Sequence, residues 1–226
     1  MSGTYLSLFS LILALTVLAG VYLWNERRRA APAEIAVIAT LAALAGVGRV
    51  PFAAVPSVQP TTFLVLICGR VFGPLAGFLI GSLAAFTSNF FLGHGPWTPW
   101  QMLAWGLAGV SGGLLPRGKA LFPRWLFTAV AFLWGFVFGW ILNFWHWLTF
   151  VYPLTFASFA ATVLAGVGFD FMHALSNALF MFFLGRELTA ILQRFKRRLS
   201  FYRIPEEELN PFQKAELRRI EDEKST

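Results

Sequence analysis

Amide, hydroxyl and imidazole side chains interrupt the apolar sequence in the middle and toward the end of this chain. Groups of this kind suit hydrogen bonding to a small molecule. The candidates are Gln59, Asn89, His94, Thr98, Gln101, Asn143, His146, Asp170, His173 and Asn177. Asp170, His173 and Asn177 recur at steps of three and four residues, so a helix would carry them on one face. We therefore expect these side chains to contribute to a common polar binding site.

Two tryptophans belong to the same region of the sequence. Trp97 and Trp100 alternate with Pro96 and Pro99. Such a turn is rigid and can present flat apolar faces to a ligand, although tryptophans also gather at membrane interfaces whatever the function. Both interpretations of Trp97 and Trp100 stay open, and we count the two residues as candidates for ligand contact.

Signatures of catalysis are mostly missing. Gly113-x-x-x-x-Gly118-Lys119 has phosphate-loop spacing, but Ala120 replaces the Ser or Thr that would hold magnesium. The three histidines lie far apart without cysteine partners, which gives little support for a zinc site. We expect no catalytic residue, no metal and no covalently bound cofactor. One enzymatic alternative stays open, in which Asp170 and His173 act as general acid and base on a lipid.

The composition indicates an all-α integral membrane protein. Hydrophobic residues make up 57% of the 226 residues and charged residues 13%, and the mean hydropathy is +0.65. This length allows about six or seven membrane-spanning helices. The net charge of +7 comes from Lys and Arg at the ends of apolar segments, so it predicts membrane topology and not nucleic-acid binding.

Apolar segments that can form membrane helices recur along the chain. They are residues 4–24, 33–50, 61–72, 74–92, 99–115, 125–145 and 169–188. Pro153 interrupts residues 148–167, which can span, re-enter or lie along the outer surface. The first segment precedes Arg27-Arg28-Arg29, which reverses the charge order of a cleaved signal peptide, so we expect a retained helix.

The basic residues predict the orientation. If the segments alternate, nearly all Lys and Arg side chains fall on one side and Arg49 falls on the other. The positive-inside rule makes the basic side cytoplasmic, with the N-terminus outside and the C-terminus inside. It also favours a non-spanning segment 148–167. We expect three parts: an N-terminal helix with its basic turn (1–30), a membrane core (31–199) and a charged cytoplasmic tail (200–226).

Small residues recur at four-residue spacing. Ala39 and Ala43 form one such series, and Ala42 and Gly46 form another. The central glycines continue the pattern at Gly69, Gly73, Gly77 and Gly81. This spacing permits close approach of membrane helices. It favours internal packing for the glycines, whereas the alanine face can be left for another membrane protein. A non-transporting scaffold that uses this face is therefore a further alternative.

Taken together, these motifs resemble the substrate-binding S components of energy-coupling factor (ECF) vitamin transporters. The resemblance rests on the alanine-rich helix ending in Gly48-Arg49, the Gln59-Pro60 entry, the glycine-rich hairpin at 69–78, the block from Ser88 to Gln101 and the segment from Phe169 to Asn177. It covers residues 33–199 and is greatest for members assigned to uptake of cobalamin or related corrinoids.

The resemblance implies a six-helix S-component-like bundle, to which residues 1–30 add one extra helix. It implies a multi-pass subunit of a bacterial-type plasma membrane that binds a vitamin. The subunit would associate with a membrane coupling protein (the T component) and two cytoplasmic ATPases. Arg49, the polar candidates above, Trp97 and Trp100 would contact the vitamin, gated by the loop at 51–60. Ala39, Ala42, Ala43 and Gly46 would meet the coupling protein.

Overall fold

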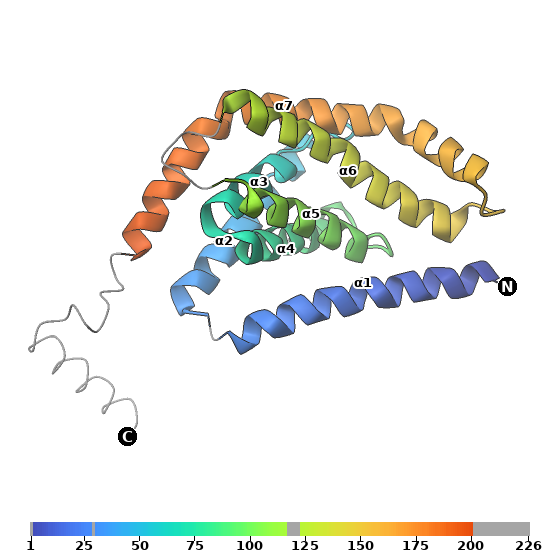
Figure 1. Ribbon diagram of the computed structural model, residues 1–226, viewed down its shortest axis with the longest axis horizontal. Helices are drawn as coiled ribbons and strands as arrows, with labels where there is room; N and C mark the ends of the chain where they lie inside the picture. Colours follow the sequence, from blue (N-terminus) through green and yellow to red (C-terminus); the bar gives the residue numbers. More distant parts are fainter. Residues whose placement is uncertain (1, 29, 117–122, 201–226) are drawn as a thin grey trace, which may run out of the picture. The chain divides into compact units, whose positions relative to one another are not determined.

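The computed structural model describes residues 2–28, 30–116 and 123–200 (Figure 1). The chain divides into two units, residues 1–192 and 193–226. In the second unit the described residues, 193–200, form the end of the last helix. The charged tail predicted at 200–226 lies outside the described residues except for Ser200. The packing described below belongs to the first unit.

Helices account for all the regular secondary structure in the described ranges, which confirms the predicted all-α membrane class. The elements are α1 (Ser2–Arg27), α2 (Pro32–Val47), the short 3-10 helix η1 (Val50–Phe52), α3 (Thr61–Phe72), α4 (Pro74–Leu92), α5 (Thr98–Leu114), α6 (Arg124–Phe150) and α7 (Phe156–Ser200). Proline at the first helical turn starts α2, α4 and α5, where a missing N–H costs nothing.

Five helical segments in the described ranges are long and apolar enough to cross a membrane. They are Tyr5–Arg27, Pro32–Phe52, Pro74–Leu92, Arg124–Phe150 and Phe156–Arg198. The two remaining helices, α3 and α5, are shorter, with 12 and 17 residues. Nearly every residue of α3 is buried, because α4 and α5 pack closely against it. This helix is therefore the centre of the core, with the longer helices around it.

Glycines allow α3, α4 and α5 to pack backbone against backbone. A Cβ placed on Gly77 of α4 would lie 2.5 Å from the carbonyl oxygen of Gly109 in α5. One placed on Gly69 of α3 would overlap the same carbonyl. Gly73 separates α3 from α4 with φ of 112°, a conformation that favours glycine. The predicted internal packing of the central glycines is confirmed.

Residues 148–167 do not form a separate element. Their first three residues end α6, a short turn follows, and α7 then runs from Phe156 without interruption through the expected start at residue 169. Thr155 and Ser158 cap the new helix reciprocally, because each backbone N–H donates to the other side chain at 3.1 Å. The predicted helix boundary at 169 is therefore wrong.

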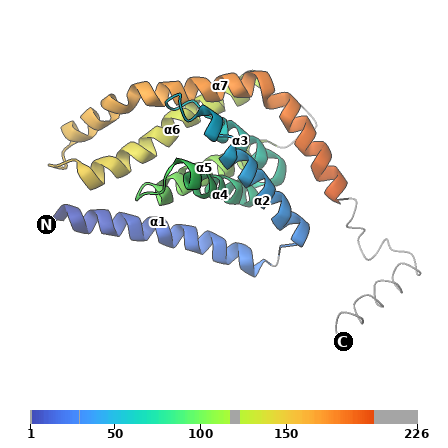
Figure 2. The ribbon, with the colours of Figure 1, turned by 180° about the vertical axis from the view of Figure 1, so that it is seen from behind.

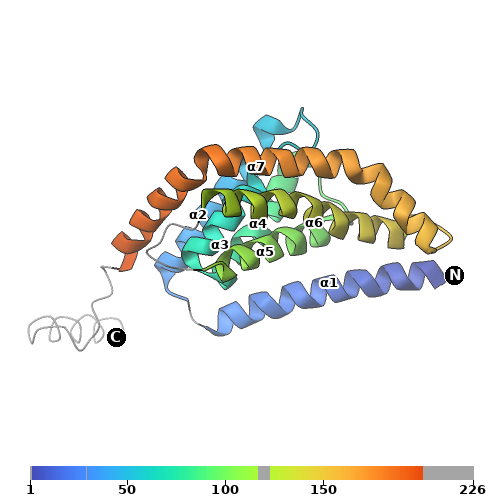
Figure 3. The same cartoon turned by 45° about the horizontal axis from the view of Figure 1, so that its top comes forward.

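The N-terminal helix α1 runs along the outside of the bundle and packs on α5 and α6 (Figures 2 and 3). Most of its apolar side chains are exposed, as expected for a helix that faces lipid. A side-chain hydrogen bond links α1 to the core, because the Tyr22 hydroxyl donates to Ser82 Oγ of α4 at 3.1 Å.

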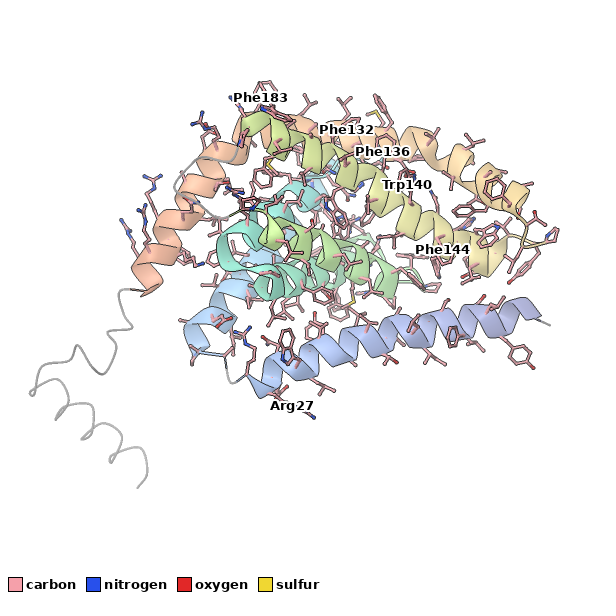
Figure 4. The ribbon with its side chains drawn as sticks, in the orientation of Figure 1. Arg27, Phe132, Phe136, Trp140, Phe144 and Phe183 are labelled. Carbon is pink, nitrogen blue, oxygen red and sulfur yellow. The ribbon has the colours of Figure 1, made fainter. Side chains whose placement is uncertain are left out.

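An aromatic row covers one face of α6. Phe132, Phe136, Trp140 and Phe144 follow one another at four-residue steps (Figure 4). Trp140 and Phe144 are exposed, and the ring centroids of Phe132 and Phe136 lie 5.5 Å apart. This row fits a lipid-facing surface, and the adjoining face of α6, with Gly135 and Gly139, packs on α7.

Candidate functional site

Arg49, in the turn between α2 and η1, lies at the centre of the polar side chains. Its Nε donates to Gln59 Oε1 at 2.8 Å, and Nη1 donates to Ser88 Oγ at 2.6 Å and to Asn89 Oδ1 at 3.5 Å. The guanidinium carbon also lies 4.6 Å from the centroid of the Trp105 ring, which is a cation–π distance. Arg49 thus joins the loop before α3 to α4 and α5.

Asn89 extends this network from α4 to α5. Its Nδ2 donates to Thr98 Oγ1 at 3.0 Å and to Gln101 Oε1 at 2.8 Å. Thr98 Oγ1 also accepts from the backbone N–H of Gly95 at 3.2 Å, which fixes the turn before α5. Five predicted site residues therefore meet in one network: Arg49, Gln59, Asn89, Thr98 and Gln101.

A second network lies beneath the first and reaches α7. Trp105 Nε1 donates to Thr62 Oγ1 at 2.9 Å, and the same oxygen lies 2.8 Å from His173 Nε2. The Phe138 ring packs between them, with its centroid 4.5 Å from Trp105 and 5.0 Å from His173. Because the Trp105 ring also stacks on Arg49, the two networks are in direct contact.

Asp170, His173 and Asn177 share a buried face of α7, as their spacing predicted, with exposed fractions of 7%, 3% and 0%. Asn143 Nδ2 donates to Asp170 Oδ2 at 3.2 Å. The Asn177 amide makes no hydrogen bond to any described residue. Asp170 and His173 bond to different partners and not to each other, so the geometry does not support the alternative in which they act as an acid–base pair.

Seven predicted site residues lie outside these networks: Asn143 and Asp170 bond to each other, the Asn177 side chain makes no hydrogen bond to a described residue, and the other four are His94, His146, Trp97 and Trp100. His94 is exposed and packs on Phe86 and Phe90, with ring centroids 5.2 and 4.8 Å away. His146 is exposed, 5.3 Å from Phe150. Trp97 and Trp100 lie around the turn before α5, Trp97 exposed and Trp100 half-buried. The indole N–H of Trp100 is buried and has no partner among the described residues.

Three residues join the networks beyond the predicted set, namely Thr62, Ser88 and Trp105. Trp105 lies four residues after Gln101 and therefore on the same face of α5. Ser88 directly precedes Asn89. These positions relative to predicted residues are the signals that could have identified them, whereas Thr62 differs in no sequence feature from its neighbour Thr61.

Exposure divides the site into a rim and a buried support. Arg49, Gln59, Gln101 and Asn143 are half-buried, so part of each side chain remains accessible. Thr62, Ser88, Asn89 and His173 are at most 3% exposed. The buried groups orient the accessible ones, and a ligand would contact the rim. Within the described ranges His, Cys, Asp and Glu do not gather in threes, so no metal centre is assigned.

The two small-residue series on α2 face in different directions. Ala42 and Gly46 are buried, and a Cβ on Gly46 would lie 3.0 Å from the Ala84 carbonyl oxygen of α4. Ala39 and Ala43 are exposed. The assignment of Ala42 and Gly46 to a partner interface is therefore corrected, because α4 already covers them. Ala39 and Ala43 remain available.

Comparison with known proteins agrees with this arrangement. A family model described as the ECF transporter substrate-specific component matches residues 33–195. A UPF0397 protein of Vibrio atlanticus (strain LGP32) is 34% identical over 87 residues, which are 36% of this chain and 47% of that protein. UPF0397 proteins of Aliivibrio fischeri (strain MJ11) and Aliivibrio salmonicida (strain LFI1238) are 32% identical over 87 residues, with the same coverage. The chain spans about half the length of these curated relatives. No solved structure matches it.

Proposed function

Because the chain belongs to the family of ECF transporter substrate-specific components, we propose that it captures a vitamin-like micronutrient at the rim formed by Arg49, Gln59, Gln101 and Asn143. Members of this family are transport subunits and not enzymes, and ATP hydrolysis belongs to separate partner subunits. The captured molecule would be a transported substrate and not a cofactor.

The observation that carries this proposal is the network around Arg49. Side chains from the loop before α3, from α4 and from α5 all bond to Arg49 or to Asn89. Polar groups within membrane helices are costly and are usually paired or functional. Here the pairing leaves the accessible parts of the side chains in a fixed arrangement, as a small-molecule site requires.

The finer assignments are part of the proposal. The substrate is cobalamin or a related corrinoid, and the partners are a membrane coupling protein and two cytoplasmic ATPases. The exposed face of α2 that carries Ala39 and Ala43 meets the coupling protein. The N-terminus lies outside the cell and the C-terminus in the cytoplasm, as the distribution of basic residues predicts.

Ligand binding to the purified chain in detergent, without nucleotide, tests the proposal. We expect labelled cobalamin to bind, and Asn89→Leu to weaken binding by about tenfold or more, because Gln101 and Arg49 each lose a hydrogen bond. Phe183→Ala is the matched control, because Phe183 is an exposed apolar side chain of α7 (Figure 4). Its affinity should equal that of the wild type.

The possible results separate the assignments. A colourless protein that gains no thermal stability from cobalamin but is stabilised by another vitamin would refute the corrinoid assignment and keep the capture function. A protein that binds no micronutrient but still associates with other membrane proteins would instead favour the scaffold alternative.

A further inference from the structure

Arg49 is a cation without a carboxylate partner among the described residues. The ion pair found in the described ranges joins Arg28 to Glu34 at 3.2 Å. Asp170, the acidic residue of the candidate site, bonds to Asn143. The hydrogen-bond partners of Arg49 are the neutral oxygens of Gln59, Ser88 and Asn89. The positive charge at the rim is thus held in place but not neutralised by these groups.

One nitrogen of the Arg49 guanidinium, Nη2, is left for a ligand. Nε and Nη1 already donate hydrogen bonds, whereas Nη2 donates none to a described residue. Nη2 is also not one of the fully buried polar atoms that lack a partner, so a ligand can reach it. Gln59 and Ser88 fix the guanidinium plane, and Trp105 covers one face of it. The N–H groups of Nη2 can donate charge-assisted hydrogen bonds to an oxygen of a carboxylate or phosphate.

Arg49 also fixes the direction of the neighbouring amides. Because a guanidinium only donates hydrogen bonds, Gln59 Oε1 and Asn89 Oδ1 must accept. Asn89 Nδ2 must then donate, and Gln101 Oε1 accepts from it. This order leaves the amide nitrogens of Gln59 and Gln101 as donors with no partner among the described residues. The half-buried rim around Arg49 therefore offers mainly N–H groups, and its oxygens are already used.

From this arrangement we propose that the substrate carries a carboxylate or phosphate group, which binds at Nη2 of Arg49 beside the amide nitrogens of Gln59 and Gln101. The inference rests on the proposed capture function and adds the chemical class of the substrate. A neutral substrate would leave a desolvated cation without a counter-charge, whereas an anion completes the site.

Matched pairs of vitamins test this inference with the full-length purified chain. The probes are nicotinate with nicotinamide, biotin with biotinamide, pantothenate with pantothenol, and thiamine monophosphate with thiamine. In whichever pair binds, we expect the anionic member to bind about 10- to 100-fold more tightly than the neutral member. Titration calorimetry and thermal stabilisation measure the two affinities. The responding pair also distinguishes a carboxylate from a phosphate.

Two variants separate recognition of the anion from structural support. Arg49→Gln should bring the acid-to-neutral ratio of affinities close to one while the neutral member still binds. Gln101→Glu keeps the shape of the side chain and its acceptor oxygen, so it should fold and should weaken the anion selectively. A general loss of structure would instead lower the affinity for both members of the pair.

The outcomes distinguish the anion inference from the proposed capture function on which it rests. A neutral member that binds as tightly as its acid, or a ratio unchanged in both variants, would overturn the anion inference and leave capture intact. A further arm incubates the chain with the small-molecule fraction of yeast extract and identifies retained compounds by mass spectrometry. A retained neutral compound overturns the inference. The absence of binding in both arms, together with no binding of labelled cobalamin, overturns the inference and the capture function together.

Discussion

Thr62 connects helices that are far apart in sequence. Its hydroxyl oxygen accepts from Trp105 Nε1 and bonds His173 Nε2, although Thr62 and His173 are 111 residues apart. We expect Thr62→Val to destabilise the protein, because each buried group left unpaired costs about 1–3 kcal/mol. The melting temperature in detergent measures the effect.

The adjacent residue provides the control for Thr62. Thr61 is equally buried, but its hydroxyl donates only to the Ala45 carbonyl oxygen at 3.2 Å. Thr61→Val should therefore cost less than Thr62→Val. Equal melting temperatures for the two variants would show that the Trp105–Thr62–His173 network contributes no specific stability.

At the scale of residues, the sequence could predict those site residues whose polar side chains cannot be left facing lipid. Amides such as Asn89 and Gln101 need partners, so their position in apolar sequence was informative. His94 and His146 were not predictable in this way, because a residue near the membrane boundary can face either the protein or the interface. Thr62 was not identifiable, since a threonine hydroxyl can also bond within its own helix.

At the scale of elements, the packing of α4 on α5 depends on glycine at the contact. We expect Gly109→Ala to destabilise the protein by about 1–3 kcal/mol, because its Cβ would overlap the backbone of Gly77. Gly20→Ala on α1 is the control, since nothing lies within 4 Å of a Cβ there. It should leave the melting temperature unchanged or slightly raised. A similar effect of both variants would contradict the close backbone packing.

The exposed face of α2 gives a prediction about the partner. Ala43→Trp should reduce co-purification of the co-expressed coupling protein and ATPases by about tenfold, because an indole on a close-packed contact costs about 1–3 kcal/mol. Ligand affinity should not change. Leu133→Trp is the control, since Leu133 is an exposed side chain of α6. Normal assembly of Ala43→Trp would remove this face from the proposed interface.

Element types were predictable from hydropathy, but one boundary was not. Apolar length predicted the helices at 61–72 and 74–92, and Gly73 marked the break between them. The single helix α7 was missed because Pro153 interrupts residues 148–167 and the distribution of basic residues favoured a non-spanning segment there. In the structure Gly166 lies against the Asn143 side chain of α6, so it serves helix packing. The cap formed by Thr155 and Ser158 was the overlooked signal for the start of α7.

At the scale of the whole molecule, orientation in the membrane decides whether the Arg49 rim can meet a substrate from outside. Basic residues predict that the end of α1 at Arg27 is cytoplasmic (Figure 4). If α2 crosses the membrane, the loop after η1 lies on the opposite side, with Ala54 exposed. The rim around Arg49 would then lie toward the exterior.

Cysteine labelling in whole cells tests this orientation. Cys68 is the one natural cysteine and is 2% exposed, so it should remain unlabelled in the folded protein. We expect a membrane-impermeant maleimide to label Ala54→Cys in intact cells and Arg27→Cys only after the cells are permeabilised. The reverse pattern would place the Arg49 rim on the cytoplasmic side, where it could not capture an external substrate. Because both variants carry their cysteine at exposed positions of the first unit, a difference in labelling reports the side of the membrane and not burial.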